Sequence, residues 1–475
     1  MIARAHAPGS APASSTTPLP PAAEILAAVE QHARPVPRYT SYPTVPFWSR
    51  EFGEAEYLDA LAEADASEPA SVYVHLPFCA KRCYYCGCNA VATSRSEVID
   101  RYLDHLEWEV RVIAECMGRR RPVDRIHWGG GTPNLLSADQ AGRLMRLLTD
   151  AFELQPDAEV SIEMDPRVAT PEQPAMLKAL GFTRISMGVQ DFDPRVQKAI
   201  GRIQPESDTV SLLEGARAAG FESVNFDLVY GLPYQTTESF RRTLDRVVEL
   251  APDRIATFSY AHLPEARRIQ QAVDASGLPE PEAKLGLFLD TVEVLENAGW
   301  QWIGFDHFAR PDDDLAVAAR ERRLLRNFMG YTTDAGTDML AFGMSAIGFV
   351  AGRFVQNSSA LGDWQDTIRD GRLPVVRGWQ LTDEDQVRGD IVQHLLCNLE
   401  LPDDLTRARF GVDLAGALGK DIEHLREMEV VGFLTRRTDR WEVTPLGRFF
   451  VRNVAASIDP WLRRTTELPT FSSSI

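Results

Sequence analysis

Four cysteines lie close together in the sequence, at Cys79, Cys83, Cys86 and Cys88. A thiolate is both a nucleophile and a strong metal ligand, so four thiols in one short loop predict metal binding or redox chemistry. Disulfides are not expected, because residues 1–21 lack the uninterrupted apolar core of a secretory signal. The cysteine loop is therefore the first candidate site.

The spacing leaves three kinds of site open. Structural zinc sites usually combine one pair of nearby cysteines with a second pair from farther along the chain. A redox dithiol needs only two cysteines, whereas an iron–sulfur cluster takes closely spaced thiolates from one loop. The spacing favours the cluster. Three ligands would leave one iron free for a cofactor or substrate, and Cys88 lies too near Cys86 to reach the same cluster easily.

Short apolar segments alternate with amphipathic helical patterns from residue 72 onward. Each segment is rich in β-branched residues, ends in Gly, Pro or polar residues, and precedes a stretch with apolar residues at helical spacing. The predicted strands cover residues 72–76, 125–128, 159–163, 184–187, 224–228 and 254–260. Strand–helix units in this order indicate a parallel sheet with helices outside it.

Polar residues follow most of these strands at or near their carboxyl ends. They are the cysteines, residues 129–132, Glu163, Gln190 and Asp227. Active sites of α/β barrels are built from the ends of many strands, whereas a doubly wound sheet concentrates its site at one switch point. We therefore predict an α/β fold with a partial (βα)6 TIM-like barrel, and a site at its carboxyl-terminal mouth.

The repeat stops after residue 311, and residues 381–461 read as mainly helical. Residues 440–447 look like one arm of a hairpin, which predicts a winged-helix-like C-terminal domain. Such domains often bind DNA, but an acidic chain favours a packing or covering module. The predicted units are a disordered tail (1–37), an N-terminal arm (38–54), the barrel with its extension (55–355) and the C-terminal helical domain (356–475).

The overall charge limits the partners. The chain has 50 basic and 68 acidic residues, a net charge of −18 and a pI near 5.0. Such a surface disfavours binding to nucleic acid or to anionic lipid. No apolar segment is long enough to span a bilayer. We expect a cytoplasmic protein with a small-molecule substrate, no nucleic-acid partner and no membrane association.

The interval C-x3-C-x2-C after the first predicted strand resembles the signature of the radical S-adenosylmethionine superfamily. The resemblance extends to the family of oxygen-independent coproporphyrinogen III dehydrogenases (oxidases) over nearly the whole chain after the tail. It rests on residues 38–44, 73–89, 129–133, 161–166, 186–192, 230–233, 260–264, 306–313 and 326–333.

This resemblance implies a reaction and its cofactors. The family converts two propionates of coproporphyrinogen III to vinyl groups by oxidative decarboxylation, which gives protoporphyrinogen IX. The implied cofactors are a [4Fe–4S] cluster and two molecules of S-adenosylmethionine, one of which yields a 5′-deoxyadenosyl radical. A reductant such as flavodoxin or ferredoxin and a monomeric state are also implied.

The resemblance further implies residue roles. The cluster ligands are Cys79, Cys83 and Cys86. The residues expected near the reacting groups are Cys88, Tyr73 and Glu163. The cofactor-binding set is Tyr73, Tyr85, Gly87, Gly130, Gly131, Thr132, Glu163, Gln190, Arg202, Asp227, Ala261 and Ile347. Chemistry supports part of this set, since carboxylates accept bonds from an ammonium group and an arginine donates to a carboxylate.

One position departs from the family pattern. Within residues 326–333 the family usually has Gln where this chain has Met329, a residue expected near the substrate or the second cofactor. Two alternative functions keep the same fold: a haem-binding chaperone, or a radical enzyme acting on another tetrapyrrole. Related haem chaperones lack the Gly87–Cys88 extension and the arm over residues 38–44, both of which this chain has. A zinc-stabilised barrel without radical chemistry is the remaining alternative.

Overall fold

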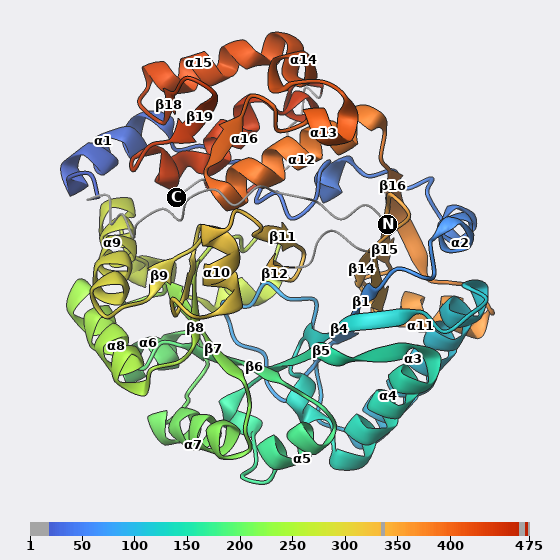
Figure 1. Cartoon of the computed structure of the whole chain (residues 1–475). Helices are drawn as coiled ribbons and strands as arrows, with labels where there is room; N and C mark the ends of the chain where they lie inside the picture. The colour runs from blue at the N-terminus through green and yellow to red at the C-terminus, as the bar shows by residue number, and fades with distance from the viewer. Residues whose placement is uncertain (1–18, 334–337, 465–470, 474–475) are drawn as a thin grey trace.

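The computed structural model describes residues 19–333, 338–464 and 471–473. A strongly curved sheet forms the centre of the molecule, with helices on its outer face (Figure 1). Neighbouring parallel strands β1, β4, β5, β6, β7 and β8 contain the predicted segments. Their bounds are Ala70–Leu76, Pro122–Gly130, Glu153–Met164, Arg184–Gln190, Ser223–Tyr230 and Arg254–Ser259. The predicted partial barrel is confirmed.

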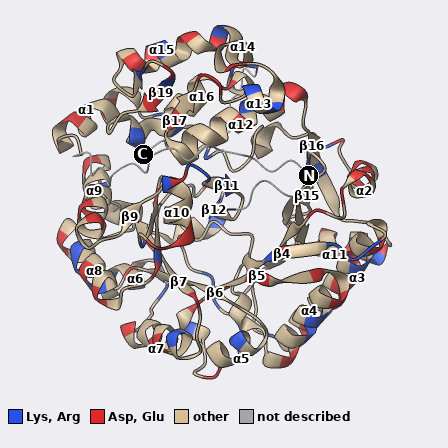
Figure 2. Ribbon diagram, in the orientation of Figure 1, with Lys and Arg blue, Asp and Glu red and all other residues tan. Residues whose placement is uncertain are grey.

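The outer helices follow from apolar residues at helical spacing. In α3, Ile99, Leu106 and Ile113 lie on one face and are buried against the sheet. Helix α4 begins with a capping box in which Ser137 accepts from the Gln140 amide at 3.2 Å. The helices covering the barrel are α3 (Ser96–Cys116), α4 (Ala138–Ala151), α5 (Gln173–Ala179), α6 (Pro194–Ala199), α7 (Glu206–Ala218), α8 (Thr237–Leu250) and α9 (Pro281–Asn297). Figure 2 shows acidic and basic residues intermixed along these helices.

The inner face of the sheet is polar, unlike the packed apolar interior of an ordinary α/β barrel. Arg125 is in register with Glu159 on the next strand, and Arg184 is in register with Ser223. Alternate residues of the same strands, such as Ile126, point outward into the core beneath the helices. Polar side chains cannot fill the barrel as a dry core, so the interior contains a cavity.

The sheet extends beyond the predicted strands at both edges. Next to β1 lies the parallel strand β13 (Met339–Phe342), followed by antiparallel β14 (Ile347–Val350), β15 (Arg353–Asn357) and β16 (Val375–Gln380). Beyond β8 lie β10 (His307–Ala309) and β9 (Gln301–Trp302). The predicted boundary between residues 355 and 356 is therefore wrong, because it cuts β15 and removes β16 from the sheet. Helix α11 (Leu361–Arg369) also packs on α3, where Trp364 stacks on Tyr102.

The C-terminal helical domain begins after β16. Its hairpin of β18 (Leu434–Arg436) and β19 (Arg440–Val443), with β17 (Glu400–Pro402), confirms the winged-helix-like pattern. The domain lies across the open side of the curved sheet (Figure 1). Its helices are α12 (Asp383–Asn398), α13 (Arg407–Phe410), α14 (Leu414–Leu418), α15 (Ile422–Val430) and α16 (Val451–Ser457). The position of this domain fits the predicted role of a module that covers the barrel.

The N-terminal region is more ordered than predicted. Helix α1 (Ala22–His32) buries Ile25 and packs near α9 and the C-terminal domain, where Asn453 donates to the His32 carbonyl at 2.8 Å. The predicted disordered tail is therefore wrong for these residues, because their apolar side chains share one helical face. Residues 1–18 of that tail lie outside the described residues.

The arm over residues 38–54 is ordered and mostly non-helical. Tyr39 and Tyr42 are buried and donate to Asp459 of the C-terminal domain at 3.0 and 3.2 Å. A short helix, α2 (Glu54–Glu63), follows the arm. The arm thus connects the barrel to the C-terminal domain. Within the described part of the chain, no helix is both long and apolar enough to cross a membrane.

Candidate active site

A cavity of about 730 Å³ occupies the barrel and is lined by residues from both ends of its strands and by the cysteine loop. This volume is in the range of sites for drug-sized ligands and cofactors. The predicted site residues that line it are Cys79, Cys83, Tyr85, Cys86, Gly87, Cys88, Gly130, Gly131, Thr132, Glu163, Gln190, Arg202, Asp227 and Ala261. Two others, Tyr73 and Ile347, lie outside this lining. The sequence thus predicted most of one continuous surface.

The cysteine loop is fastened to the first two barrel strands. Cys79 ends the short strand β2 (Phe78–Cys79), which pairs with β3 (Val91–Ala92) and so closes the loop. The Thr132 hydroxyl donates to the Cys79 sulfur at 3.3 Å. The Gly131 amide donates to the Leu76 carbonyl at 2.9 Å, which holds the loop against β4. The loop is therefore placed by the barrel itself.

The glycines allow this close approach. A side chain at Gly131 would bring its Cβ within 2.7 Å of the Phe78 carbonyl oxygen. Gly130 has a φ of 109°, and a Cβ there would lie 2.4 Å from the His75 ring. The amides of Gly130, Gly131 and Thr132 are already bonded within the chain. These amides thus position the loop and Glu163, and their predicted contacts with a cofactor stay a prediction.

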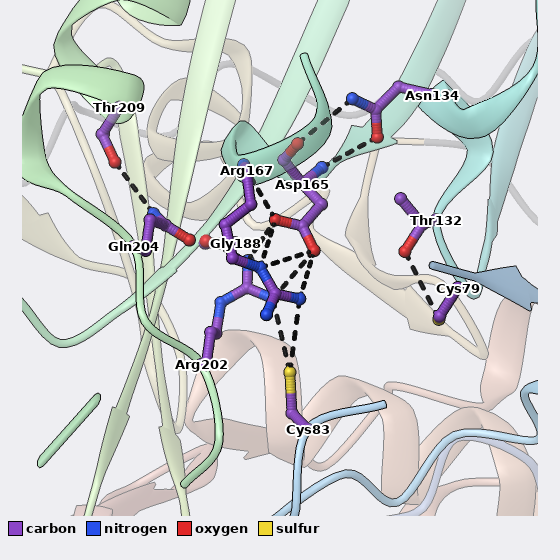
Figure 3. A network of polar contacts seen from close by, with 10 residues as sticks. All are labelled: Cys79, Cys83, Thr132, Asn134, Asp165, Arg167, Gly188, Arg202, Gln204 and Thr209. Carbon is purple, nitrogen blue, oxygen red and sulfur yellow. Dashed lines mark hydrogen bonds and ion pairs between the residues drawn. The ribbon is translucent and has the colours of Figure 1, made fainter. Parts of the chain in front are cut away.

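A buried ion-pair network lies directly behind Cys83 (Figure 3). Arg202 donates two 3.1 Å bonds to Asp165 and one 2.6 Å bond to the Gly188 carbonyl. Arg167 also donates to Asp165, at 2.6 Å. Burial alone would raise the pKa of Asp165, but the two guanidinium groups lower it below its usual range. Arg202 is therefore already paired with a carboxylate of the chain, which the sequence did not predict.

The same two arginines contact the sulfur of Cys83. Arg167 Nη2 lies 3.5 Å from it and Arg202 Nη1 lies 3.6 Å from it. The two guanidinium groups therefore place positive charge beside a predicted ligand of the cluster. Asp165 and Arg167 are thus functional candidates that the sequence interpretation missed. Their only sequence signal was Asp165–Pro166 within a stretch already matched to the family.

The two last cysteines of the loop differ in ionisation. A hydrogen bond from the Cys88 thiol, opposed by burial and assisted by Arg82 and Arg267, lowers the pKa of Cys86 to about 6. The bond to Cys86, together with burial, raises the pKa of Cys88 well above its usual range. Cys86 is therefore a thiolate at neutral pH while Cys88 keeps its proton. This difference suits the predicted ligand and non-ligand roles.

The residues present fit an iron–sulfur cluster better than a single metal ion. Among the described residues, no three His, Cys, Asp or Glu side chains converge closely enough to hold one ion. Three irons of a [4Fe–4S] cluster would each take one of the thiolates, so Cys79, Cys83 and Cys86 need not converge on one point. All of them line the same cavity, and each thiol has a hydrogen-bonding or cationic neighbour.

Two carboxylates face the cavity from neighbouring parts of the barrel. Glu163 accepts from the Gly130 amide at 3.0 Å and lies 3.6 Å from His127 Nε2. Burial opposes ionisation of Glu163, but His127 and the amide lower its pKa overall. Burial and the charge of Glu163 raise the pKa of Asp227 to about 6, although Ser186 donates to Asp227 at 3.0 Å. Such a pair can accept bonds from an ammonium group and from ribose hydroxyls.

Tyr73 packs behind the residues that line the cavity and contacts two histidines there. Its hydroxyl bonds with His75 Nδ1 at 3.0 Å, and its ring stacks on His127 with centroids 5.9 Å apart. His127 was missed by the sequence interpretation, although it lies two residues before the glycine run. Ile347 lies on β14, outside the cavity lining. Cofactor contacts of Tyr73 and Ile347 stay predictions.

Gln190 ends β6 in a left-handed conformation, with a φ of 68°. Such a φ is uncommon outside glycine and marks positions held by their surroundings. A Cβ at Gly188 would lie 2.8 Å from Gln190 Nε2 and 2.9 Å from Arg202 Nη2. Gly188 therefore leaves the space that both predicted side chains occupy. Met329, the departure from the family pattern, also lines the cavity.

The curved parallel sheet with a three-cysteine loop at its mouth defines a radical S-adenosylmethionine fold. A family profile described as "Radical SAM superfamily" matches residues 73–247, and one described as "HemN C-terminal domain" matches residues 381–450. The second match begins where the large sheet ends, in agreement with the corrected boundary.

Comparison with whole proteins identifies one family within this superfamily. The oxygen-independent coproporphyrinogen III oxidase of Escherichia coli K12 is 42% identical over 450 residues, which cover 95% of this chain and 98% of that protein. The oxidase of the same name from Synechocystis is 38% identical over 93% of this chain and 96% of that protein. The solved structure of coproporphyrinogen III oxidase (HemN) from Escherichia coli, described as a radical SAM enzyme, has a TM-score of 0.88 and covers 92% of this chain. The chain belongs to the family of oxygen-independent coproporphyrinogen III oxidases.

Proposed function

We propose that this chain catalyses the oxygen-independent oxidative decarboxylation of two propionates of coproporphyrinogen III to vinyl groups, giving protoporphyrinogen IX. The observation that carries this proposal is the whole-length match to the Escherichia coli oxidase, which includes the arm and the C-terminal domain as well as the barrel. A match limited to the cysteine loop would support radical chemistry without a substrate.

The chain's own residues bind and orient the reacting groups. Cys79, Cys83 and Cys86 hold the cluster, while Asp165 fixes the arginines that hold Cys83. When bound, the reduced cluster and S-adenosylmethionine supply the 5′-deoxyadenosyl radical that removes a hydrogen atom from the substrate propionate. The glycine run gives the cysteine loop its close approach to β4.

Glu163 and Asp227 supply the acceptors for S-adenosylmethionine. Both carboxylates line the cavity near the cysteine loop. Glu163 is kept ionised by His127 and the Gly130 amide, so it can accept from an ammonium group. Asp227 has its oxygens oriented by Ser186 and Asn225, which suits hydroxyl donors. Gln190, Arg202 and Ala261 complete the surface on which one or two molecules of the cofactor bind.

The remaining partners follow from this reaction. The cluster needs a low-potential electron from a reductant such as flavodoxin or ferredoxin, and an external acceptor takes the electron left after carbon dioxide is lost. We expect the enzyme to act as a cytoplasmic monomer, since one chain provides the complete cavity.

An anaerobic assay tests the proposal. Purified protein with a reconstituted cluster, given coproporphyrinogen III, S-adenosylmethionine and dithionite-reduced flavodoxin, should form protoporphyrinogen IX and 5′-deoxyadenosine. Stoichiometric haem binding without turnover would instead indicate a carrier. A product of different mass would indicate another tetrapyrrole as the substrate.

A further inference from the structure

A second, smaller cavity lies beside the first, at the carboxyl ends of β7 and β8. It has a volume of about 50 Å³ and lies where the arm, the barrel and the C-terminal domain meet. Ser259 lines both cavities, so they adjoin at this residue. The polar side chains around the small cavity are Arg38, Tyr230, Ser259, Asp306, Arg448 and Arg452.

The small cavity has an excess of positive charge. It is lined by Arg38, Arg448 and Arg452 but by only one carboxylate, that of Asp306. Asp306 is already paired, since Arg38 contacts it and His307 Nδ1 lies 2.7 Å from its other oxygen. Over the described residues, no carboxylate oxygen lies within 4.0 Å of a nitrogen of Arg448 or Arg452. Two guanidinium groups therefore face the cavity region without a direct counter-ion.

Arg448 still has donors available. It lies in the short helix Gly447–Phe450, its guanidinium stacks on the Trp302 ring at 3.7 Å, and it donates to the Trp302 carbonyl. Its Nε atom is buried and has no hydrogen-bond partner among the described residues. Burial lowers the pKa of Arg448 to about 10, which leaves it charged at neutral pH. A buried, charged donor without a partner is costly unless a ligand completes it.

Arg452 lies on α16 and is only 8% exposed. It donates to the Val36 carbonyl at 3.2 Å and to the Ser473 carbonyl, so its hydrogen bonds go to neutral groups, and the nearby carboxylate of Asp306 favours its charge without pairing with it directly. Burial and the neighbouring charge of Arg38 lower its pKa to about 10. Together the two arginines make the small cavity a site for an anion.

The volume suits a small, flat anion. A water molecule needs roughly 10–15 Å³ on the same measure, so the small cavity has room for about the three atoms of a carboxylate group. Arginine presents a planar fork of donors that matches a carboxylate. The hydroxyls of Tyr230 and Ser259 lie at the same cavity and provide further donors.

We propose that the small cavity binds one propionate carboxylate of the substrate, one that is not converted to a vinyl group. This inference rests on the proposed function, because it takes the macrocycle to occupy the main cavity. The main cavity presents carboxylates such as Glu163 and Asp227 as well as arginines, whereas the small cavity has three arginines and a single carboxylate that is already paired. The propionate would enter beside Ser259, the residue that lines both cavities. The subsite fixes which propionates remain near the cysteine loop.

Kinetics of Arg448 variants test the subsite. Arg448→Met removes the charge and keeps an unbranched apolar side chain, and Arg448→Lys restores the charge without the planar fork. Loss of a charged hydrogen bond should raise the KM for coproporphyrinogen III about 10- to 100-fold in Arg448→Met, with kcat little changed. Arg448→Lys should recover part of that loss. The matched control Arg407→Met removes an exposed arginine of the same domain and should leave KM unchanged.

A second variant is made at Ser259, so that both buried arginines are kept. Ser259→Val enlarges the side chain that the two cavities share and removes its hydroxyl, so it should raise KM in the same way while leaving Arg448 intact. Cluster content and the thermal midpoint of each variant report folding separately. An unchanged KM in both Arg448→Met and Ser259→Val, in protein that folds and turns over, overturns the subsite. Absence of product from the wild-type chain would instead overturn the proposed function.

Discussion

Substitution of Asp165 by Asn is the sharpest test of the network behind Cys83. Asp165 and Arg202 have side chains that are 9% and 7% exposed, and Asp165 also pairs with Arg167. Breaking a buried ion pair costs about 3–5 kcal/mol, because the partner charge stays buried. Asn keeps the size and one acceptor oxygen, so we expect a loss of about 3 kcal/mol in the free energy of unfolding. The cluster should also be bound less fully, since Cys83 loses its fixed cationic neighbours.

Anaerobic urea unfolding at pH 7 provides the measurement, with iron content of the folded protein as a second reading. The matched control is Asp314→Asn, which removes a carboxylate that is 70% exposed and pairs with Arg184 at 2.8 Å. Exposed pairs contribute about 0–1 kcal/mol, so the free energy of unfolding of this variant should stay near that of the wild type.

The pH dependence gives a further test. Because the folded pKa of Asp165 is lowered, its contribution to the free energy of unfolding is present above its unfolded pKa near 3.8 and is lost as the pH falls further. Equal unfolding of Asp165→Asn, Asp314→Asn and wild type would refute this reasoning.

Four further substitutions separate the roles of residues that line the main cavity. Cys86→Ser should abolish the brown cluster, while Cys88→Ser should keep it, because Cys86 is a predicted cluster ligand and the high pKa of Cys88 keeps that thiol protonated; visible absorption after reconstitution distinguishes the two. Met329→Gln should change the KM for coproporphyrinogen III by no more than about 10-fold, since one cavity contact is altered; loss of cofactor cleavage would contradict this. In cofactor-free protein, stability should rise by up to about 3 kcal/mol as the pH falls from above 6 toward 3.8, because Asp227 binds its proton more tightly when folded. Asp227→Asn should flatten that pH dependence in urea titrations.

The parallel core of the fold was predictable because local patterns determine it. Each of its strands is a short β-branched segment, and each is followed by a helix whose apolar residues recur at helical spacing. The polar residues at strand ends, such as Glu163 and Asp227, also indicated the site, since the carboxyl ends of parallel strands meet at one edge. The cysteine motif follows the first predicted strand, so the cluster loop was expected at the same edge of the sheet.

The remaining structure depends on contacts between distant segments. Strands β15 and β16 were not among the predicted strands, and only their antiparallel pairing with each other and with β14 places them in the sheet. Helix α1 is held by packing against α9 and the C-terminal domain. Asp165 gave no local sign that it pairs with Arg202, which lies 37 residues farther along the chain. The second cavity likewise requires three segments to meet.

The central claim is that Cys79, Cys83 and Cys86 hold a cluster that drives decarboxylation of coproporphyrinogen III. Mass spectrometry of a strictly anaerobic turnover tests it directly. The reconstituted wild-type chain should form protoporphyrinogen IX together with 5′-deoxyadenosine, and Cys83→Ala should form neither. Cleavage of S-adenosylmethionine without loss of carboxyl groups from the porphyrinogen, or product from Cys83→Ala, would contradict the claim.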